Sequence, residues 1–281
     1  MQLQSILTNS PYYPKEWLSL PDAPQTLWCV GDISLLQTRK FTIVGSRRTP
    51  AAALKTAGEI AKSLSAVYTI VSGAADGGDT AAVEGALSAN GKVIFILAGG
   101  MSVMPQSNYR MMQQIMQNGL LLSPYPPDTP TRTFSYEYRN KLLATLGEGT
   151  LVVGAAEKSG ALITAKYAKQ YKKPVFALPY TVGSACGAGC NALIKTGAYL
   201  TETAEDVAQK MGISLQKKVQ KISLTTDEEK MLTALKDSAE EHITALSQKS
   251  GVPVFKARAV LSSLEVKGLV VALGGNRYAP V

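Results

Sequence analysis

Short runs of aliphatic and β-branched residues alternate along the first three quarters of the chain with longer segments whose apolar residues have helical spacing. Runs that are apolar at nearly every position are typical of strands covered on both faces of a parallel sheet. Strands and helices that alternate in this way predict an α/β fold, a Rossmann-like doubly wound domain with a mostly parallel sheet, over residues 36–211. The runs lie at residues 41–45, 67–73, 92–100, 120–123, 150–155 and 173–179.

The segments between the runs carry signals for helix starts. Residues 50–65 are expected to form a helix with Thr49 as its N-cap and Pro50 at its first position. Asp79 or Thr80 is expected to cap the next helix, and Arg139 is expected near the start of a later one. Because ligands of doubly wound sheets bind at the carboxyl ends of the strands, the loops that precede these helices are the candidate site.

The two ends of the chain have different patterns. Residues 1–35 are rich in proline and aromatic residues and are expected to form an extended N-terminal arm over the sheet. Residues 212–225 are basic, lack periodicity and are predicted to be a linker. Residues 226–281 read as three helices followed by two short β runs around a Gly-Gly-Asn turn, an order that predicts a small C-terminal winged helix-turn-helix domain.

Length and composition indicate the cellular compartment in which the protein is expected. No stretch of the 281 residues approaches the roughly 20 apolar residues of a membrane helix, and the N-terminus lacks the pattern of a secretory signal. The chain has only three cysteines, Cys29, Cys186 and Cys190, and this small, odd number argues against a disulfide framework. We therefore expect a cytoplasmic protein.

The charge balance favours a polyanionic partner, and the scarcity of histidine argues against several kinds of enzyme. The net charge is +8 and the isoelectric point about 9.3. The single histidine, His242, lies far from the predicted sheet, which lowers the expectation of histidine-based catalysis or a zinc site. Cys186 and Cys190 alone are weak support for a metal. We predict no catalytic residue, no metal and no cofactor.

The first two strand ends carry the parts of an anion site. After the first run, Gly45, Ser46, Arg47 and Arg48 lie directly before a helix, so that a close backbone approach, a hydroxyl, two guanidiniums and a helix N-terminus come together. The second turn, at residues 71–82, is rich in glycine and includes Gly73, but it has neither the dinucleotide-binding nor the Walker spacing. Asp76 and Asp79 in this turn are interpreted as turn or cap residues.

Further candidate residues follow the later strands. They include Asn108 and Arg110, then Arg139, Asn140 and Lys141, and finally Ser159 and Gly160 at another helix start. Phe134, Tyr136 and Tyr138 interleave with cations, a mixture that suits stacking on the bases of single-stranded nucleic acid. An equally good reading is that these rings close the edge of the core. The predicted DNA-binding set is Gly45, Ser46, Arg47, Arg48, Gly73, Asn108, Arg110, Arg139, Asn140, Lys141, Ser159 and Gly160.

Several of these motifs follow one another in a fixed order. They are residues 44–47, residues 72–82, Arg139-Asn140-Lys141, residues 159–165 and residues 189–198. In this order and spacing the sequence resembles the DNA processing protein A (DprA/Smf) family. The resemblance implies a recombination mediator of natural transformation rather than an enzyme. Such a protein binds and protects incoming single-stranded DNA, forms a homodimer and loads the RecA recombinase.

The resemblance also marks where this chain departs from the family. It implies that Gly45, Ser46, Arg47, Arg139, Asn140 and Lys141 form the DNA pocket. Members commonly have Ile in place of Gly78, Tyr in place of Met104, a cation in place of Gln106 and Phe-Pro in place of Tyr136-Glu137. Arg48 or Arg110 is expected to compensate for the lost charge. The helical N-terminal module of some members is expected to be missing, because only about 40 residues precede the first strand.

Two alternatives remain at this point. One is a nucleotide-hydrolysing Rossmann enzyme, similar to the lysine-decarboxylase-like phosphoribohydrolases, although residues 157–162 lack the glycine pair and threonine of their P-G-G-x-G-T loop. The other assigns DNA binding to the winged helix, whose third helix carries Lys256, Arg258 and Lys267. That helix offers few cations for reading a major groove, so we expect it to be auxiliary.

Overall fold

The computed structural model describes residues 2–73, 75–103, 109–215, 224–236 and 238–280. The chain divides into two compact units, Met1–Gln216 and Lys217–Val281. None of the helices in these described ranges has the length and apolar run that crossing a membrane requires.

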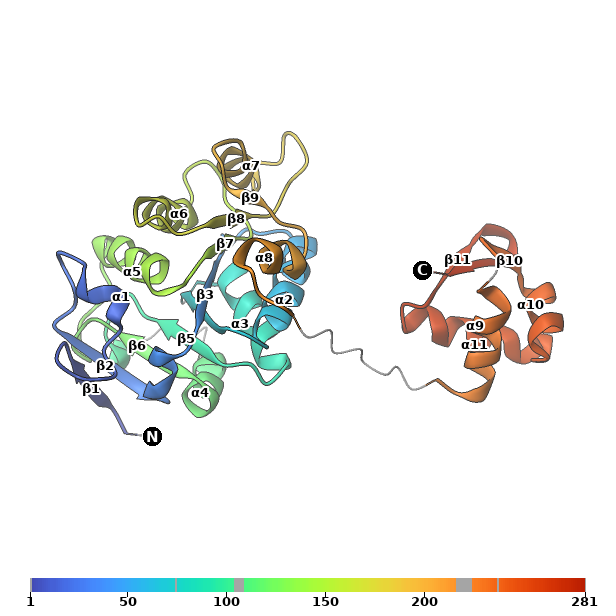
Figure 1. Ribbon diagram of the computed structural model, residues 1–281, viewed down its shortest axis with the longest axis horizontal. Helices are drawn as coiled ribbons and strands as arrows, with labels where there is room; N and C mark the ends of the chain where they lie inside the picture. Colours follow the sequence, from blue (N-terminus) through green and yellow to red (C-terminus); the bar gives the residue numbers. More distant parts are fainter. Residues whose placement is uncertain (1, 74, 104–108, 216–223, 237, 281) are drawn as a thin grey trace. The chain divides into compact units, whose positions relative to one another are not determined.

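The larger unit is built on one sheet, drawn in Figure 1. Within the described residues the sheet has nine strands in the order β1-β2-β6-β5-β4-β3-β7-β8-β9. The strands from β6 to β9 are parallel, whereas β1 and β2 pair antiparallel at one end. The predicted mostly parallel α/β sheet is thereby confirmed. The strands are β1 (Gln4–Leu7), β2 (Thr26–Gly31), β3 (Lys40–Val44), β4 (Thr69–Gly73), β5 (Val93–Ile96), β6 (Leu120–Ser123), β7 (Thr150–Val152), β8 (Val175–Ala177) and β9 (Tyr199–Leu200).

Helices cover both faces of this sheet, and the strands supply alternate residues to each. Ile43 and Phe95 belong to one buried cluster, whereas their neighbours Val44 and Ile94 belong to the other. This alternation is the doubly wound arrangement that the sequence predicts. One face carries α2 (Ala51–Leu64), α3 (Gly78–Ser88), α4 (Tyr109–Asn118) and α8 (Ala204–Met211); the other carries α1 (Lys15–Leu18), α5 (Thr133–Leu146), α6 (Gly160–Gln170) and α7 (Ala188–Lys195).

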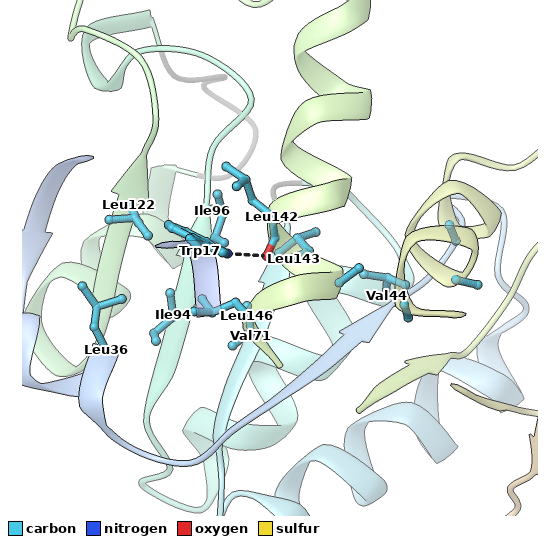
Figure 2. Packing of buried hydrophobic residues seen from close by; sticks show 14 of the residues in the cluster. Trp17, Leu36, Val44, Val71, Ile94, Ile96, Leu122, Leu142, Leu143 and Leu146 are labelled. Atoms are coloured by element: carbon cyan, nitrogen blue, oxygen red, sulfur yellow. Dashed lines mark hydrogen bonds between the residues drawn. The ribbon is translucent and has the colours of Figure 1, made fainter. Parts of the chain in front are cut away.

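The N-terminal residues have a different role from the extended arm predicted for 1–35. Residues 4–7 and 26–31 are strands of the sheet, and between them Trp17 of α1 is fully buried. Its Nε1 donates a hydrogen bond of 3.3 Å to the carbonyl oxygen of Leu142 on α5 (Figure 2). This segment therefore completes the core beneath α5. Sequence alone missed the strands because the runs are short and lie among prolines and turn residues.

Three predicted helix boundaries are wrong. Pro50, not Thr49, is the N-cap of α2, and the Thr49 hydroxyl donates to the Ser46 carbonyl instead. Gly77, with φ of 86°, is the N-cap of α3, so Asp79 lies inside the helix. Arg139 and its two neighbours lie in the middle of α5 rather than at its start. The Thr49 side chain is used within its own turn, and that of Asp79 contacts the β3 turn, so neither is left to cap its helix.

The smaller unit has its own core. Met231, Leu246 and Leu261 are fully buried, one from each of its three helices. The elements follow in the predicted order, three helices and a hairpin, and the winged-helix assignment stays a prediction. The elements are α9 (Thr226–Leu235), β10 (Glu241–His242), α10 (Ile243–Ser250), α11 (Val254–Val266), β11 (Val270–Leu273), η4 (Gly274–Asn276) and β12 (Arg277–Pro280).

Candidate nucleic-acid interface

A hollow of about 430 Å³ lies at the carboxyl ends of β3 and β7. These strands are neighbours in the sheet although three other strands separate them in sequence, so the site lies where the strand order reverses. Ligands of open α/β sheets bind at this position. The residues that line the hollow are Val44, Gly45, Ser46, Arg47, Arg48, Ala75, Asp79, Tyr136, Arg139, Asn140, Ala156, Lys158, Ser159, Gly160, Ala161 and Thr164.

The turn after β3 is held by its backbone. Gly45 and Gly78 pack so closely that a β-carbon added at Gly78 would lie 2.5 Å from the Cα of Gly45. Ser46 donates its N–H to the Gly154 carbonyl at 2.8 Å, and its own carbonyl accepts from the backbone N–H of Gly78 at 3.3 Å. The start of α3 and the end of β7 therefore fix this turn, and the contact accounts for glycine at position 78.

Arg47 and Arg48 extend from this fixed turn into solvent. The Ser46 hydroxyl oxygen accepts from the backbone N–H of Arg48 at 3.2 Å. Neither guanidinium forms a hydrogen bond or an ion pair with any residue that the structure describes. Two cations on a rigid turn, with no internal partner, are therefore available to an anion in the hollow.

Asp79 ties the turn to α3. Its Oδ1 accepts a hydrogen bond of 2.9 Å from the backbone N–H of Gly45. Burial raises the pKa of Asp79, while the charge of Arg139 and backbone N–H groups of Gly45, Ala75 and Gly73 act to lower it. A buried carboxyl held in this way positions the turn, and it is not exposed to act as an acid or a base.

Arg139 is the buried anchor of the site. Its Nη1 donates to the Ile96 carbonyl at 3.2 Å and its Nε to Asn140 Oδ1 at 3.1 Å. Burial lowers the pKa of Arg139, opposed by the charge of Asp79, and the nearby charge of Arg47 lowers it further. Gly73 leaves room for this side chain, because a β-carbon there would lie 2.1 Å from Nη1. Arg139 therefore links the ends of two strands and adds positive potential beneath the hollow.

The start of α6 also lines the hollow. Ser159 is its N-cap and accepts from the backbone N–H of Ala161 at 3.3 Å, while Asn140 Nδ2 donates to the Gly160 carbonyl at 3.2 Å. A helix N-terminus favours anions. Lys158, directly before the N-cap, is exposed and lines the hollow. Sequence reasoning missed Lys158, although a lysine between a strand end and a serine N-cap was a usable signal.

Lys141 does not line the hollow, contrary to the prediction. Its ammonium group forms an ion pair with Asp22 and lies 6.0 Å from the ring centre of Tyr167. Burial acts to lower the pKa of Lys141, but the hydrogen bond and charge of Asp22 raise it overall. The residue therefore joins α5 to the N-terminal segment.

Two other predicted residues also lie outside the lining, and a third is not among the described residues. Gly73 borders Arg139 instead of the hollow. Arg110 is exposed on α4 and is not among the residues that line the hollow. Asn108 lies outside the described residues, as do Met104 and Gln106. Of the predicted set, the structure brings together Gly45, Ser46, Arg47, Arg48, Arg139, Asn140, Ser159 and Gly160.

The three aromatic residues of α5 divide between the two readings. Tyr136 lines the hollow and keeps 43% of its surface exposed. Phe134 is 61% exposed but does not line it. Tyr138 packs edge-on against Tyr125 and donates to the Asp22 carbonyl at 2.6 Å. Tyr138 thus closes the edge of the core, and of these three rings only that of Tyr136 is offered to a ligand in the hollow.

Comparison with known proteins identifies the family. Residues 4–212 match the family described as DNA recombination-mediator protein A. The chain belongs to that family. The match spans the sheet and the hollow, and it confirms the resemblance to the DprA/Smf proteins. It places the chain among recombination mediators and does not favour the nucleotide-hydrolysing alternative.

Individual DprA relatives agree with this assignment. The chain is 35% identical over 196 residues to the DNA processing protein DprA of Streptococcus pneumoniae, covering 69% of this chain and 70% of the relative. The X-ray structure of that organism's DprA has a TM-score of 0.71 at 33% identity, over 75% of each chain. A Helicobacter pylori structure that concerns a single-stranded DNA binding mode of DprA has a TM-score of 0.68 at 31% identity, over 75% of this chain and 96% of the other.

Proposed function

We propose that this protein binds single-stranded DNA in the hollow between the β3 turn and the start of α6. The Helicobacter pylori relative, 31% identical over the larger part of the chain, is described as binding single-stranded DNA. The observation that carries the proposal is the pair Arg47 and Arg48, two guanidiniums on a rigid turn without an internal partner among the described residues.

The lining groups suit a nucleotide chain. Lys158 and the α6 N-terminus line the same hollow as the two arginines, so phosphates bound there can meet cations and N–H donors from both turns. Tyr136 supplies a ring on which a base can stack, a contact open to every base and to unpaired strands only. We therefore expect backbone recognition with little sequence preference.

The lining argues for binding and against catalysis. Asp79 carries the only carboxylate among the described lining residues, and it is buried and hydrogen-bonded to the backbone N–H of Gly45. Hydrolysis of a nucleotide requires a base or nucleophile within reach of the substrate. The hollow holds its ligand by charge and stacking.

The test compares single-stranded and double-stranded oligonucleotides over a range of salt concentrations. If about four phosphates are neutralised, affinity for the single strand falls roughly 50-fold between 50 and 200 mM salt. Arg47→Ala is expected to weaken binding and to reduce the slope by about 0.7. Arg110→Ala removes the same charge from α4 and serves as the matched control. An unchanged slope in Arg47→Ala, or equal losses in both variants, would contradict the site.

The wider role follows from the same family. We infer that the bound strand is incoming DNA in natural transformation, that the protein acts as a cytoplasmic homodimer, and that it passes the strand to the RecA recombinase. The test is the rate of RecA filament formation on a single strand with and without this protein. We expect acceleration by the unaltered chain and a smaller effect with Arg47→Ala. A rate that is independent of the protein would contradict the transfer to RecA and leave DNA binding untouched.

A further inference from the structure

The outer face of α11 in the smaller unit carries an exposed stripe. We define the α11 stripe as Phe255, Ala259, Ser262 and Val266, spaced four, three and four residues apart. Phe255 is 80% exposed and Val266 is 90% exposed. The opposite face of the helix already supplies the core. The stripe thus has two large apolar residues with small residues between them, at coiled-coil spacing. Such a stripe is typical of a surface on which a second helix packs.

The stripe is complementary to itself when two copies of the helix run in opposite directions. Phe255 then faces Val266 of the second copy at both ends, and Ala259 faces Ser262 of the second copy at the centre. The small central residues permit the helices to approach closely, and each end combines one large and one smaller apolar group. The pattern is therefore symmetric about the middle of the helix, as a two-fold interface requires.

The charges beside the stripe favour the same orientation. Arg258 and Glu265 lie on one flank, seven residues apart. In an antiparallel pair this flank faces the same flank of the other helix, so Arg258 lies opposite Glu265 of the second copy, twice. A parallel pair would bring neither charge opposite its complement.

The hairpin holds both charged residues at this edge. Arg258 Nη2 donates to Asn276 Oδ1 at 2.7 Å, and Glu265 Oε1 accepts from the backbone N–H of Ala272 at 3.3 Å. Val271 and Leu273 of β11 are also exposed and lie on one side of that strand. We propose that α11 docks against α11 of a second copy of this chain, antiparallel and related by a two-fold axis.

The same face is poorly suited to duplex DNA. Readers of the major groove present several polar side chains along one helix face, whereas the α11 stripe offers two apolar residues, an alanine and a serine. Its neighbouring guanidinium, on Arg258, already donates to Asn276. The contact rests on the proposed homodimer, but it can be tested apart from DNA binding because it uses none of the residues that line the hollow.

The test is cysteine cross-linking of the full chain with Cys186 replaced by Ser. Chains carrying Ala259→Cys and Ser262→Cys, distinguished by tags of different length, are produced together and oxidised mildly. The antiparallel pair predicts that the mixed dimer forms severalfold faster than either matched dimer. Arg47→Ala is expected to leave this ratio unchanged, which separates the contact from DNA binding. Equal rates for all three dimers, or no cross-link, would overturn the proposal.

Charge exchange in the same cysteine background tests the register. Arg258→Glu and Glu265→Arg, each alone, are expected to lower the mixed cross-link about tenfold, since each replaces two attractive pairs by two repulsive ones. The double exchange restores the pairs between chains, but not the two contacts with the hairpin, and is expected to recover most of the yield. Lys230→Glu on α9 is the matched control. A double variant whose cross-link yield is as low as that of the single variants would overturn the proposed α11 contact. A stripe variant, Phe255→Asp, with an unchanged yield and weaker binding of duplex DNA would overturn it as well.

Discussion

The carboxylate of Asp79 accepts a hydrogen bond of 2.9 Å from the backbone N–H of Gly45, a residue 34 positions earlier in the chain. Asp79 lies in the first turn of α3, and Gly45 follows the last residue of β3. The bond therefore joins the helix that packs on the sheet to the turn that carries Arg47. Burial raises the pKa of Asp79, and the nearby charge of Arg139 acts in the opposite direction. The two buried charges stabilise each other beneath the hollow.

Asp79→Asn is expected to loosen this turn. The amide oxygen can still accept one hydrogen bond, but its NH₂ group then faces backbone donors, and Arg139 loses its negative neighbour. A loss of roughly 2–4 kcal/mol in the free energy of unfolding follows from removing one partner of a buried charged network. Urea unfolding followed by fluorescence of Trp17 and Trp28 measures it, because both lie in the larger unit. Asp76→Asn, at an exposed position of the same loop, is the control, and equal midpoints for both variants would contradict the role.

Replacing a glycine by alanine is expected to affect the stability of the protein differently at two positions of the hollow. A β-carbon at Gly45 would lie 2.5 Å from Val153 Cγ2 and 2.8 Å from the Cα of Gly78. At Gly160 the nearest atom would be 3.8 Å away, and the residue begins α6. Gly45→Ala is therefore expected to destabilise the protein by about 1–3 kcal/mol. Gly160→Ala is expected to be neutral or stabilising by up to about 1 kcal/mol. Thermal unfolding of both variants measures the two changes in stability. A larger destabilisation by Gly160→Ala than by Gly45→Ala would show that the β3 turn moves freely.

The strands and the location of the site could be predicted from the sequence because both follow from local pattern. Apolar runs that end in glycine mark buried strands, and parallel strands bring their carboxyl ends to one edge. Ser46, Arg47 and Ser159 were found in this way. Ser46 and Arg47 lie in the short turn between β3 and α2, and Ser159 directly precedes α6, so their places at the strand ends follow from local pattern.

The failures concern residues whose role depends on a partner far along the chain. Three consecutive residues on a helix point about 100° apart, so Arg139, Asn140 and Lys141 cannot all face one hollow. Only the fold shows that Lys141 turns toward Asp22, more than a hundred residues earlier. Asp79 likewise looks like a local cap until Gly45 is placed beside it. Sequence spacing identified these residues as unusual but did not assign their contacts.

Tyr136 and Arg47 are expected to contribute to DNA binding in different ways. Tyr136→Ala removes a stacking surface and is expected to weaken single-strand binding by about 1–3 kcal/mol, with no change in the salt slope because no charge is lost. Tyr136→Phe is expected to retain most of the affinity. Phe134→Ala removes a ring of similar size that does not line the hollow, and it is the control. Fluorescence anisotropy with a labelled single strand measures all three, and an altered slope in Tyr136→Ala would assign it a role other than stacking.

The stability of the smaller unit is expected to depend on pH through Glu228. Its carboxylate accepts from Lys267 Nζ at 2.7 Å, from the Thr225 backbone N–H at 2.7 Å and from the Ser263 hydroxyl at 2.8 Å. These contacts, that with Lys267 first, lower the pKa of Glu228 from 4.5 to about 2. Because the folded pKa lies below the unfolded one, the stabilisation is complete above about pH 5 and is lost as the pH falls through 2.

Glu228→Gln is therefore expected to destabilise α9 at neutral pH and to have progressively less effect as the pH falls from 4.5 toward 2. Hydrogen exchange of the α9 amides reports this locally, and comparing both proteins at each pH removes the intrinsic pH dependence of exchange. Glu229→Gln, at the exposed neighbouring position, changes the same charge without these partners and is the control. A difference between Glu228→Gln and the unaltered chain that stayed constant down to pH 2 would mean that the ionised carboxylate is not what stabilises the helix.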